Sequence, residues 1–247
     1  DLIEFCKRMQ PDYKVGRHHR ILADQLMALE DGSKDRVCVN IPPRHGKSQL
    51  VSIFYPAWFL GRNPTKKVMM VSHTTDLAVD FGRKVRNLIA VEDYKEIFPD
   101  VSLAVDSKSA GRWNTNFGGE YFACGIGSAL AGRGADLLLV DDPHSEQDVI
   151  NGNFSVFDKA YEWFTFGART RLMPGGRVAI IQTRWHMDDL TGRVTDDMIK
   201  NEGSDQYEII EFPAILDAED GTQKPLWPEF FDLDALTRTK ASMPTFQ

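Results

Sequence analysis

The stretch VCVNIPPRHGKS, residues 37–48, decides the fold of this chain. Its apolar first half predicts a short buried strand, and Gly46-Lys47-Ser48 follows directly. This order is typical of a phosphate-binding loop, in which backbone N–H groups and the start of the next helix surround an anion. In such a loop Lys47 contacts the β- and γ-phosphates, and the Ser48 hydroxyl is a ligand of Mg²⁺.

The loop departs from the usual pattern at one position. A glycine is expected six residues before the lysine, and Ile41 stands there instead. Pro42 and Pro43 fix the backbone φ angle and lower the entropy cost of holding the loop curled. The alternative is a chance Gly-Lys-Ser at an ordinary strand-to-helix turn.

Composition restricts the class of protein. The 247 residues are 42% hydrophobic and 26% charged, which is ordinary for a globular chain with one substantial core. The net charge of −7 excludes a uniformly basic nucleic-acid coat but leaves room for a local basic groove. The three cysteines have no Cys-x-x-Cys spacing, so no disulfide framework or zinc site is predicted. No apolar run is long enough to cross a membrane.

An amphipathic helix is predicted over residues 18–30, before the first strand. The segment just ahead of it, residues 13–20, is basic and contains Tyr13. It either contacts the base of a bound nucleotide, with His19 as the candidate residue, or forms a solvated helix start.

Downstream of the loop, helices are predicted over residues 49–60 and 76–90, with a buried strand at 67–72 between them. Gln49 opens the first of these helices beside the loop. Arg83, Lys84 and Arg86 lie on the second helix, where they either meet a DNA backbone or form a solvated face.

A second chemical motif ends the apolar run at residues 137–140, which leads into Asp141 and Asp142. In open α/β sheets, ligands bind beyond the carboxyl ends of the strands, so these acids and the phosphate loop are expected to converge. Asp141 would hold Mg²⁺, and a second carboxylate, Asp142 or Glu146, would polarise the attacking water. Together with the loop, this motif predicts ATP or GTP hydrolysis.

A third strand, residues 177–183, ends in Thr183 and Arg184, where a sensor of the γ-phosphate is needed. Trp185 and His186 are assigned to packing. Beyond residue 195 the pattern weakens, and Trp227 and the Phe230-Phe231 pair predict a tail that folds back or packs on a neighbour.

Four motifs in this order resemble the ATPase half of a tailed-phage large terminase: PPRHGKS at 42–48, LLLVDDP at 137–143, TRWHMDDL at 183–190 and PLWP at 225–228. The resemblance implies an α/β fold of the additional-strand, conserved-glutamate P-loop type, similar to RecA, with a mostly parallel sheet. It implies an ATPase core at residues 1–194, a lid or linker at 195–247, and a ribonuclease-H-like nuclease domain after residue 247.

The resemblance also implies roles for individual residues. Pro43, Arg44, His45, Gly46 and Gln49 join Lys47 and Ser48 in the nucleotide site, and Arg44 matches the loop arginine of the family. Thr183 matches the motif that couples hydrolysis to movement. Many members place the catalytic glutamate where Asp142 stands, so Glu146 is the favoured base and Asp142 the fallback. Arg133, in the glycine-rich loop before the second strand, is the candidate arginine finger for a neighbouring subunit, with DNA contact as the alternative.

The implied activity is ATP-driven translocation of double-stranded viral DNA into a procapsid. The implied partners are the portal protein, the small terminase subunit and further copies in a ring, with a monomer in isolation and no membrane. The implied location is the host cytoplasm, docked transiently on the procapsid. Two rivals are weaker: a superfamily-2 helicase needs a second RecA-like domain, and a nucleotide switch or small-molecule kinase lacks motor activity. No guanine-reading Asn-Lys-x-Asp is found.

Overall fold

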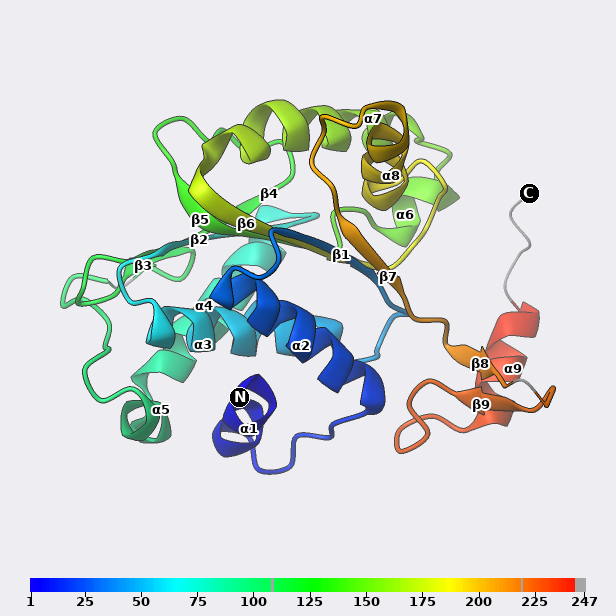
Figure 1. Cartoon of the computed structure of the whole chain (residues 1–247), viewed down its shortest axis with the longest axis horizontal. Helices are drawn as coiled ribbons and strands as arrows, with labels where there is room; N and C mark the ends of the chain where they lie inside the picture. The colour runs from blue at the N-terminus through cyan, green and yellow to red at the C-terminus, as the bar shows by residue number, and fades with distance from the viewer. Residues whose placement is uncertain (108, 219, 243–247) are drawn as a thin grey trace.

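A computed structural model of the chain describes residues 1–107, 109–218 and 220–242, and its centre is a seven-stranded sheet (Figure 1). The sheet has the strand order β3-β4-β2-β5-β6-β1-β7, and all neighbours are parallel except β3 and β4. Its strands are β1 (Arg36–Asn40), β2 (Lys67–Ser72), β3 (Arg112–Asn114), β4 (Glu120–Gly125), β5 (Ala135–Asp141), β6 (Leu172–Gln182) and β7 (Glu208–Glu211).

Helices cover both faces of the sheet. Figure 1 shows α1 to α5 on one face and α6 to α8 on the other. The helical segments are α1 (Leu2–Met9), α2 (Arg17–Asp31), η1 (Gln49–Phe54), α3 (Tyr55–Arg62), α4 (Thr75–Ala90), α5 (Glu92–Ile97), α6 (Glu146–Ile150), α7 (Ser155–Glu162), η2 (Trp163–Ala168), η3 (Arg169–Arg171), α8 (Leu190–Lys200) and α9 (Leu233–Ser242).

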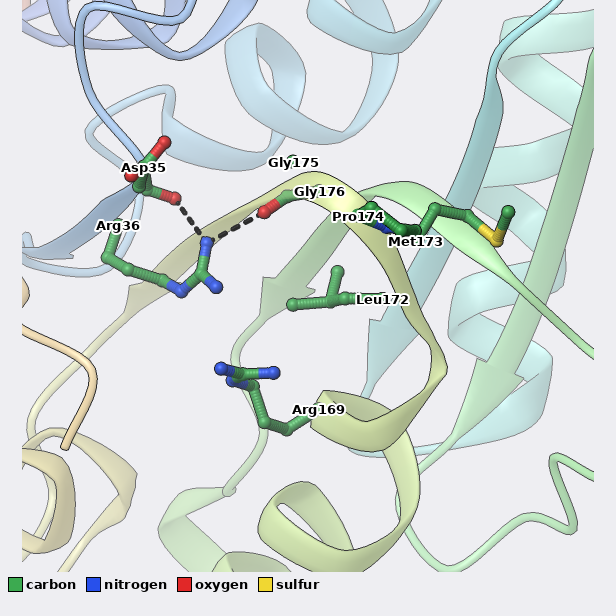
Figure 2. A pocket seen from close by; sticks show the side chains of 8 residues that line it. All are labelled: Asp35, Arg36, Arg169, Leu172, Met173, Pro174, Gly175 and Gly176. Atoms are coloured by element: carbon green, nitrogen blue, oxygen red, sulfur yellow. Dashed lines mark hydrogen bonds between the residues drawn. The ribbon is translucent and has the colours of Figure 1, made fainter. Parts of the chain in front are cut away.

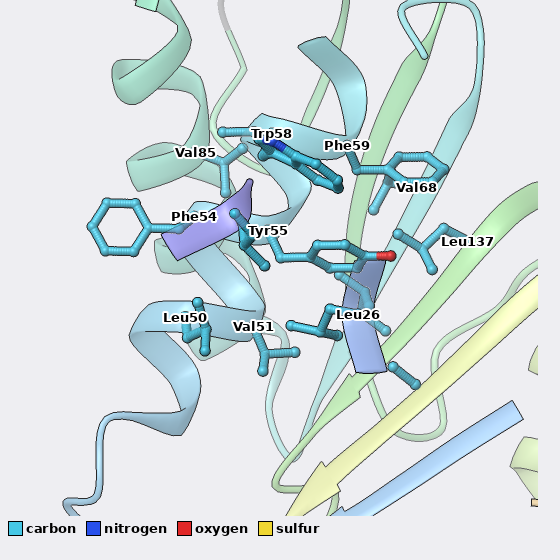
Figure 3. Close-up of a cluster of buried hydrophobic side chains, with 14 of the residues drawn as sticks. Leu26, Leu50, Val51, Phe54, Tyr55, Trp58, Phe59, Val68, Val85 and Leu137 are labelled. Carbon is cyan, nitrogen blue, oxygen red and sulfur yellow. The ribbon is translucent and has the colours of Figure 1, made fainter. Parts of the chain in front are cut away.

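The strands are buried on both faces because alternate side chains enter two separate cores. Leu137 and Leu139 of β5 pack with the aromatic side chains of η1 and α3, as Figure 3 shows for Leu137. Leu138 and Val140 point to the other face, where Phe164 and the residues of α8 cover them. The near-continuous apolar runs of the sequence therefore follow from a two-sided helical covering.

The order of the central strands confirms the predicted fold class. β6 lies between β1, which carries the loop, and β5, which carries the two aspartates. This inserted strand is the one that defines the additional-strand type of P-loop fold. It also brings the carboxyl ends of β1, β6 and β5 side by side.

Two local predictions need adjustment. Pro174-Gly175-Gly176, which reads as a turn, lies within β6 as a bulge, since Ala135 pairs with Leu172 while Leu137 pairs with Arg177. The region expected to hold only antiparallel strands also extends the main sheet, because β4 pairs parallel to β2 as well as antiparallel to β3.

Residues 212–242, called the C-terminal segment below, extend beyond β7 to one side of the sheet (Figure 1). They contain an antiparallel pair, β8 (Ile215–Asp217) and β9 (Gln223–Pro225), followed by α9. The predicted boundary at residue 195 falls within α8, and β7 on its far side pairs with β1. Positions 219 and 243–247 of the predicted lid lie outside the described residues.

Among the described residues, no helix has both the length and the apolar character needed to span a membrane.

Candidate active site

The predicted phosphate-binding loop connects β1 to η1 at the carboxyl end of the sheet. Its backbone turns at Arg44 and Gly46, whose φ angles of 61° and 78° are both in the left-handed region. Ile41, at the usual place of the first glycine, is buried and continues the strand by donating to the Gln182 carbonyl at 3.0 Å. The curl that the missing glycine normally allows is therefore made three residues later, at Arg44.

Two adjacent histidines of α2 hold the loop from behind. The Nε2 atoms of His18 and His19 each lie 3.0 Å from the carbonyl oxygen of His45. The Gly16 backbone N–H donates to Nδ1 of His19 at 2.9 Å, so the proton of this ring is on Nε2 and is donated to His45. Burial lowers the pKa of His19 to about 3, which keeps the ring neutral.

This brace sets the direction of the loop amides. The peptide after His45 is trans, so its carbonyl and the N–H of Gly46 point in opposite directions. With the carbonyl held by the histidines, the Gly46 N–H faces the inside of the loop. A Cβ on Gly46 would lie 2.3 Å from Nε2 of His19, so glycine is required here for space as well as for its φ angle.

The C-terminal segment lies over the same histidines. The ring centroid of Trp227 is 5.4 Å from that of His18 and 4.8 Å from that of His19, and Phe231 stacks on His45 at 4.7 Å. The tail therefore folds back onto the loop, which is one of the two outcomes expected from its aromatic residues. His19, predicted to contact the base, has no exposed surface and bonds to backbone through both ring nitrogens.

A second group of contacts, the lysine junction, joins Lys47, Asp142 and Thr183. Nζ of Lys47 lies 2.8 Å from Oδ2 of Asp142 and donates to Oγ1 of Thr183 at 3.0 Å. The Thr183 backbone N–H donates to Oδ1 of Asp142 at 2.7 Å. The ends of β1, β5 and β6 are therefore linked at one point, as the sequence predicted for the loop and the acids.

Asp141 lies beside this junction and has the properties of a metal ligand. It is 1% exposed, and Ser52 donates a 2.6 Å hydrogen bond to Oδ2. Burial and then the negative charge of Asp142 raise the pKa of Asp141 to about 6, against the opposing effects of the Ser52 hydroxyl, Lys47 and the nearby Ser48 hydroxyl.

The remaining oxygen of Asp141 supports the same assignment. Oδ1 is buried and has no hydrogen-bond partner among the described residues. A buried carboxylate oxygen without a partner, next to a serine hydroxyl, fits Mg²⁺, which takes one or two protein oxygens together with substrate phosphates. Within the described part of the chain, no group of three or more His, Cys, Asp or Glu side chains forms a metal site of another kind.

The other predicted site residues have different surroundings. Arg44 and Pro43 are exposed on the loop, and Gln49 donates to Oε1 of Gln10 at 2.6 Å. Glu146 is exposed as the first residue of α6. Arg133 precedes β5, whose seven residues rise about 20 Å before Asp141 is reached.

Arg133 is therefore at the opposite edge of the sheet from Lys47. There Nη1 lies 3.3 Å from Oε1 of Glu120, and the guanidinium lies over the ring of Phe122 at 4.5 Å. The cavity in Figure 2 belongs to that edge as well: its volume is about 410 Å³, and it is lined by Arg36, Arg169 and the β6 bulge. It contains no residue of the phosphate loop.

The segment after Thr183 is fixed by a polar network that sequence reasoning missed. Arg184 donates to Oδ2 of Asp189 at 2.7 Å, and Asp189 caps α8 by accepting from the Gly192 N–H at 3.0 Å. Thr191 donates to Oδ1 of Asn40 at 2.8 Å and accepts from Gln182 at 2.7 Å. The signal was a polar residue, Asn40 or Gln182, at the end of each buried strand. His186 packs as predicted, stacked on Phe157 at 5.1 Å.

Comparison with known proteins agrees with this geometry. The family model described as "Terminase large subunit, T4likevirus-type, N-terminal" matches residues 38–224, more than half of the chain. No curated protein sequence matches the chain.

Solved structures show the same fold at low sequence identity. A point mutant of the ATPase domain of the Thermus phage P74-26 large terminase is 19% identical, with 89% of this chain and 88% of that chain covered and a TM-score of 0.50. The large terminase of another thermophilic bacteriophage, in complex with ATP-gamma-S, is 12% identical, and 89% of this chain and 49% of that chain are covered, with a TM-score of 0.45.

The family match covers the loop, both aspartates and Thr183, and it favours a packaging ATPase over a nucleotide switch or a small-molecule kinase. The chain belongs to the terminase large subunit family of T4likevirus type and forms its N-terminal ATPase domain.

Proposed function

We propose that the lysine junction is the ATP hydrolysis site and that its turnover drives translocation of double-stranded DNA into a procapsid. One observation carries the proposal: Lys47, the two aspartates and Thr183, from three separate strands, meet at one edge of the sheet. Membership of the terminase family supports the nucleotide assignment, and a large terminase of a thermophilic bacteriophage has been solved with ATP-gamma-S and with ADP.

In this mechanism the loop amides and Lys47 bind the β- and γ-phosphates, with Arg44 free on the loop to reach them. Pro43, His45 and Gln49 complete the cradle, and Ser48 and Asp141 would hold Mg²⁺, which when bound neutralises charge on the phosphate oxygens. Glu146 orients the attacking water, with Asp142 as the alternative carboxylate.

Arg133 acts in trans. Because it lies one strand length from the site of its own chain, it can reach a triphosphate only in a neighbouring copy. Charge favours such head-to-tail packing, since the start edge of the sheet is rich in basic residues while Asp141, Asp142 and Glu146 lie at the other edge. The basic residues are Arg36, Lys67, Arg133, Arg169, Arg171 and Arg177. A trans arginine is worth about 10³-fold or more in turnover, so an isolated monomer hydrolyses ATP slowly.

The remaining assignments rest on family membership. The partners are viral DNA, the portal protein and the small terminase subunit, in a ring docked transiently on the procapsid in the host cytoplasm. Residues 195–247 act as a lid or linker on the core at 1–194, and the contacts of Trp227 and Phe231 with the loop histidines support that role.

The test is DNA-stimulated ATP turnover. Lys47→Ala is expected to abolish it, and Glu146→Gln to reduce it at least about 10²-fold while ATP still binds. Glu202→Gln, an exposed glutamate after α8, is the matched control and keeps wild-type turnover. Wild-type hydrolysis by Glu146→Gln would remove it as the base, and turnover indifferent to DNA would contradict the motor.

A mixing experiment tests the trans arginine. Arg133→Ala and Lys47→Ala are each inactive alone, but a mixed assembly contains interfaces that combine an intact site with an intact Arg133. Partial recovery of turnover on mixing is expected. Absence of recovery, with each variant still assembling, would contradict trans action.

A further inference from the structure

Asp142 has contacts that its position after a metal-binding aspartate does not require. Its two carboxylate oxygens are used separately: Oδ2 lies 2.8 Å from Nζ of Lys47, and Oδ1 accepts from the Thr183 N–H at 2.7 Å. The side chain of Lys47 is only 7% exposed, so this carboxylate is its main anionic neighbour in the nucleotide-free chain.

The backbone holds this carboxylate in place. Asp142 has a φ angle of 43°, a left-handed conformation that few residues other than glycine, asparagine and aspartate adopt. Hydrogen bonds on both sides fix it, because its N–H donates to the Ile181 carbonyl at 2.9 Å and its carbonyl accepts from the His73 N–H at 3.1 Å. The strained residue is therefore locked with its side chain on Lys47.

We propose that Asp142 is a positioning residue that takes the place of the γ-phosphate on Lys47 when no nucleotide is bound, and that ATP must displace it. The inference rests on the proposed ATP site. A phosphate oxygen and the Asp142 carboxylate are both anions and seek the same ammonium group, so they compete for it. Of the three hydrogens of that group, one faces Asp142 and one Thr183.

Displacement has a consequence beyond binding. Lys47 and Asp142 both contact Thr183, which begins the segment leading through Arg184 and Asp189 to the cap of α8. When the γ-phosphate takes Lys47, Asp142 loses its cation and the grip on Thr183 changes. Presence of the γ-phosphate is thereby read at the end of β6, and ADP, which lacks it, leaves Asp142 on Lys47.

The test compares ATPγS and ADP binding, by calorimetry with Mg²⁺, in the wild type and in Asp142→Asn. Asparagine keeps the shape and removes the competing charge, so affinity for ATPγS is expected to rise about tenfold, while affinity for ADP changes less than about twofold. Asp142→Glu keeps the charge and is expected to stay near the wild type. Asp188→Asn, a half-exposed aspartate of the same edge, is the matched control.

Three outcomes decide the matter. An ATPγS affinity that is unchanged or lower in Asp142→Asn, or an equal gain for ADP, overturns the inference, because a purely structural role changes both nucleotides alike. If Asp142→Asn does not fold, Asp142→Ser must show the same selective gain, and its absence overturns the inference. A wild-type chain that binds neither nucleotide removes the proposed function itself, which separates the two failures.

Discussion

Replacing His19 tests whether the histidine brace shapes the phosphate loop. In His19→Ala the buried N–H of Gly16 loses its acceptor, and His45 keeps only the bond from His18. An unpaired buried donor costs about 1–3 kcal/mol, and the space left by a ring with no exposed surface adds about 2 kcal/mol. The expected loss in the free energy of unfolding is therefore about 3–5 kcal/mol.

The same substitution also acts on nucleotide binding. With one bond to the His45 carbonyl lost, the Gly46 N–H is no longer fixed toward the loop interior, and ATP affinity is expected to fall about tenfold. Urea unfolding and titration with a fluorescent ATP analogue measure the two effects. His73→Ala is the matched control, because His73 is 38% exposed and its ion pair with Asp148 is 3.7 Å long.

The two readouts separate the brace from the direct base contact that the sequence suggested for His19. A base contact alone would lower affinity and leave the unfolding free energy within about 0.5 kcal/mol of the wild type. A loss of stability with wild-type ATP affinity would show that the histidine supports α2 but not the loop. Either result would refute the role of His19 in shaping the loop.

Three further predictions follow from buried groups. Asp141→Asn is expected to stabilise the nucleotide-free chain by about 1–3 kcal/mol at pH 7, since a carboxylate with its pKa raised to about 6 is ionised there at a cost, and to abolish hydrolysis; a lower melting temperature would contradict this. His19 and His144, with pKa values lowered to about 3 and about 4, stay neutral in the fold, so stability is expected to fall as pH drops from about 6.5 toward 4, by up to about 1.4 kcal/mol per pH unit for each histidine; urea midpoints that do not change across this range would disprove it. Trp227→Ala is expected to loosen the C-terminal segment from the loop, so that limited proteolysis cuts after residue 212 while the sheet core survives, and unchanged cleavage would count against the contact.

Motifs with strong local chemistry were predictable from the sequence. Gly46-Lys47-Ser48, the apolar run before Asp141 and the strand before Thr183 each follow from residue type and order, and their convergence follows from the strand-end rule for open sheets. The additional strand came from the family resemblance, and the position of β6 confirms it.

The rest depended on contacts between distant segments. Nothing local joins His19 to the loop at His45, or Trp227 to either, because those contacts arise only when α2 and the C-terminal segment pack on the same loop. The left-handed backbone of Arg44, which replaces the expected glycine, is likewise imposed by the tertiary structure. The roles of Glu146 and Arg133 stay predictions.

The central claim is that one Mg²⁺-bound triphosphate lies where β1, β5 and β6 end. A crystal structure of the chain with ATPγS and Mg²⁺ tests it most directly. The account predicts Ser48 and Asp141 on one metal ion, the γ-phosphate on Lys47, and Asp142 moved off that lysine. A nucleotide bound elsewhere, or Ser48 and Asp141 facing different ligands, would contradict it.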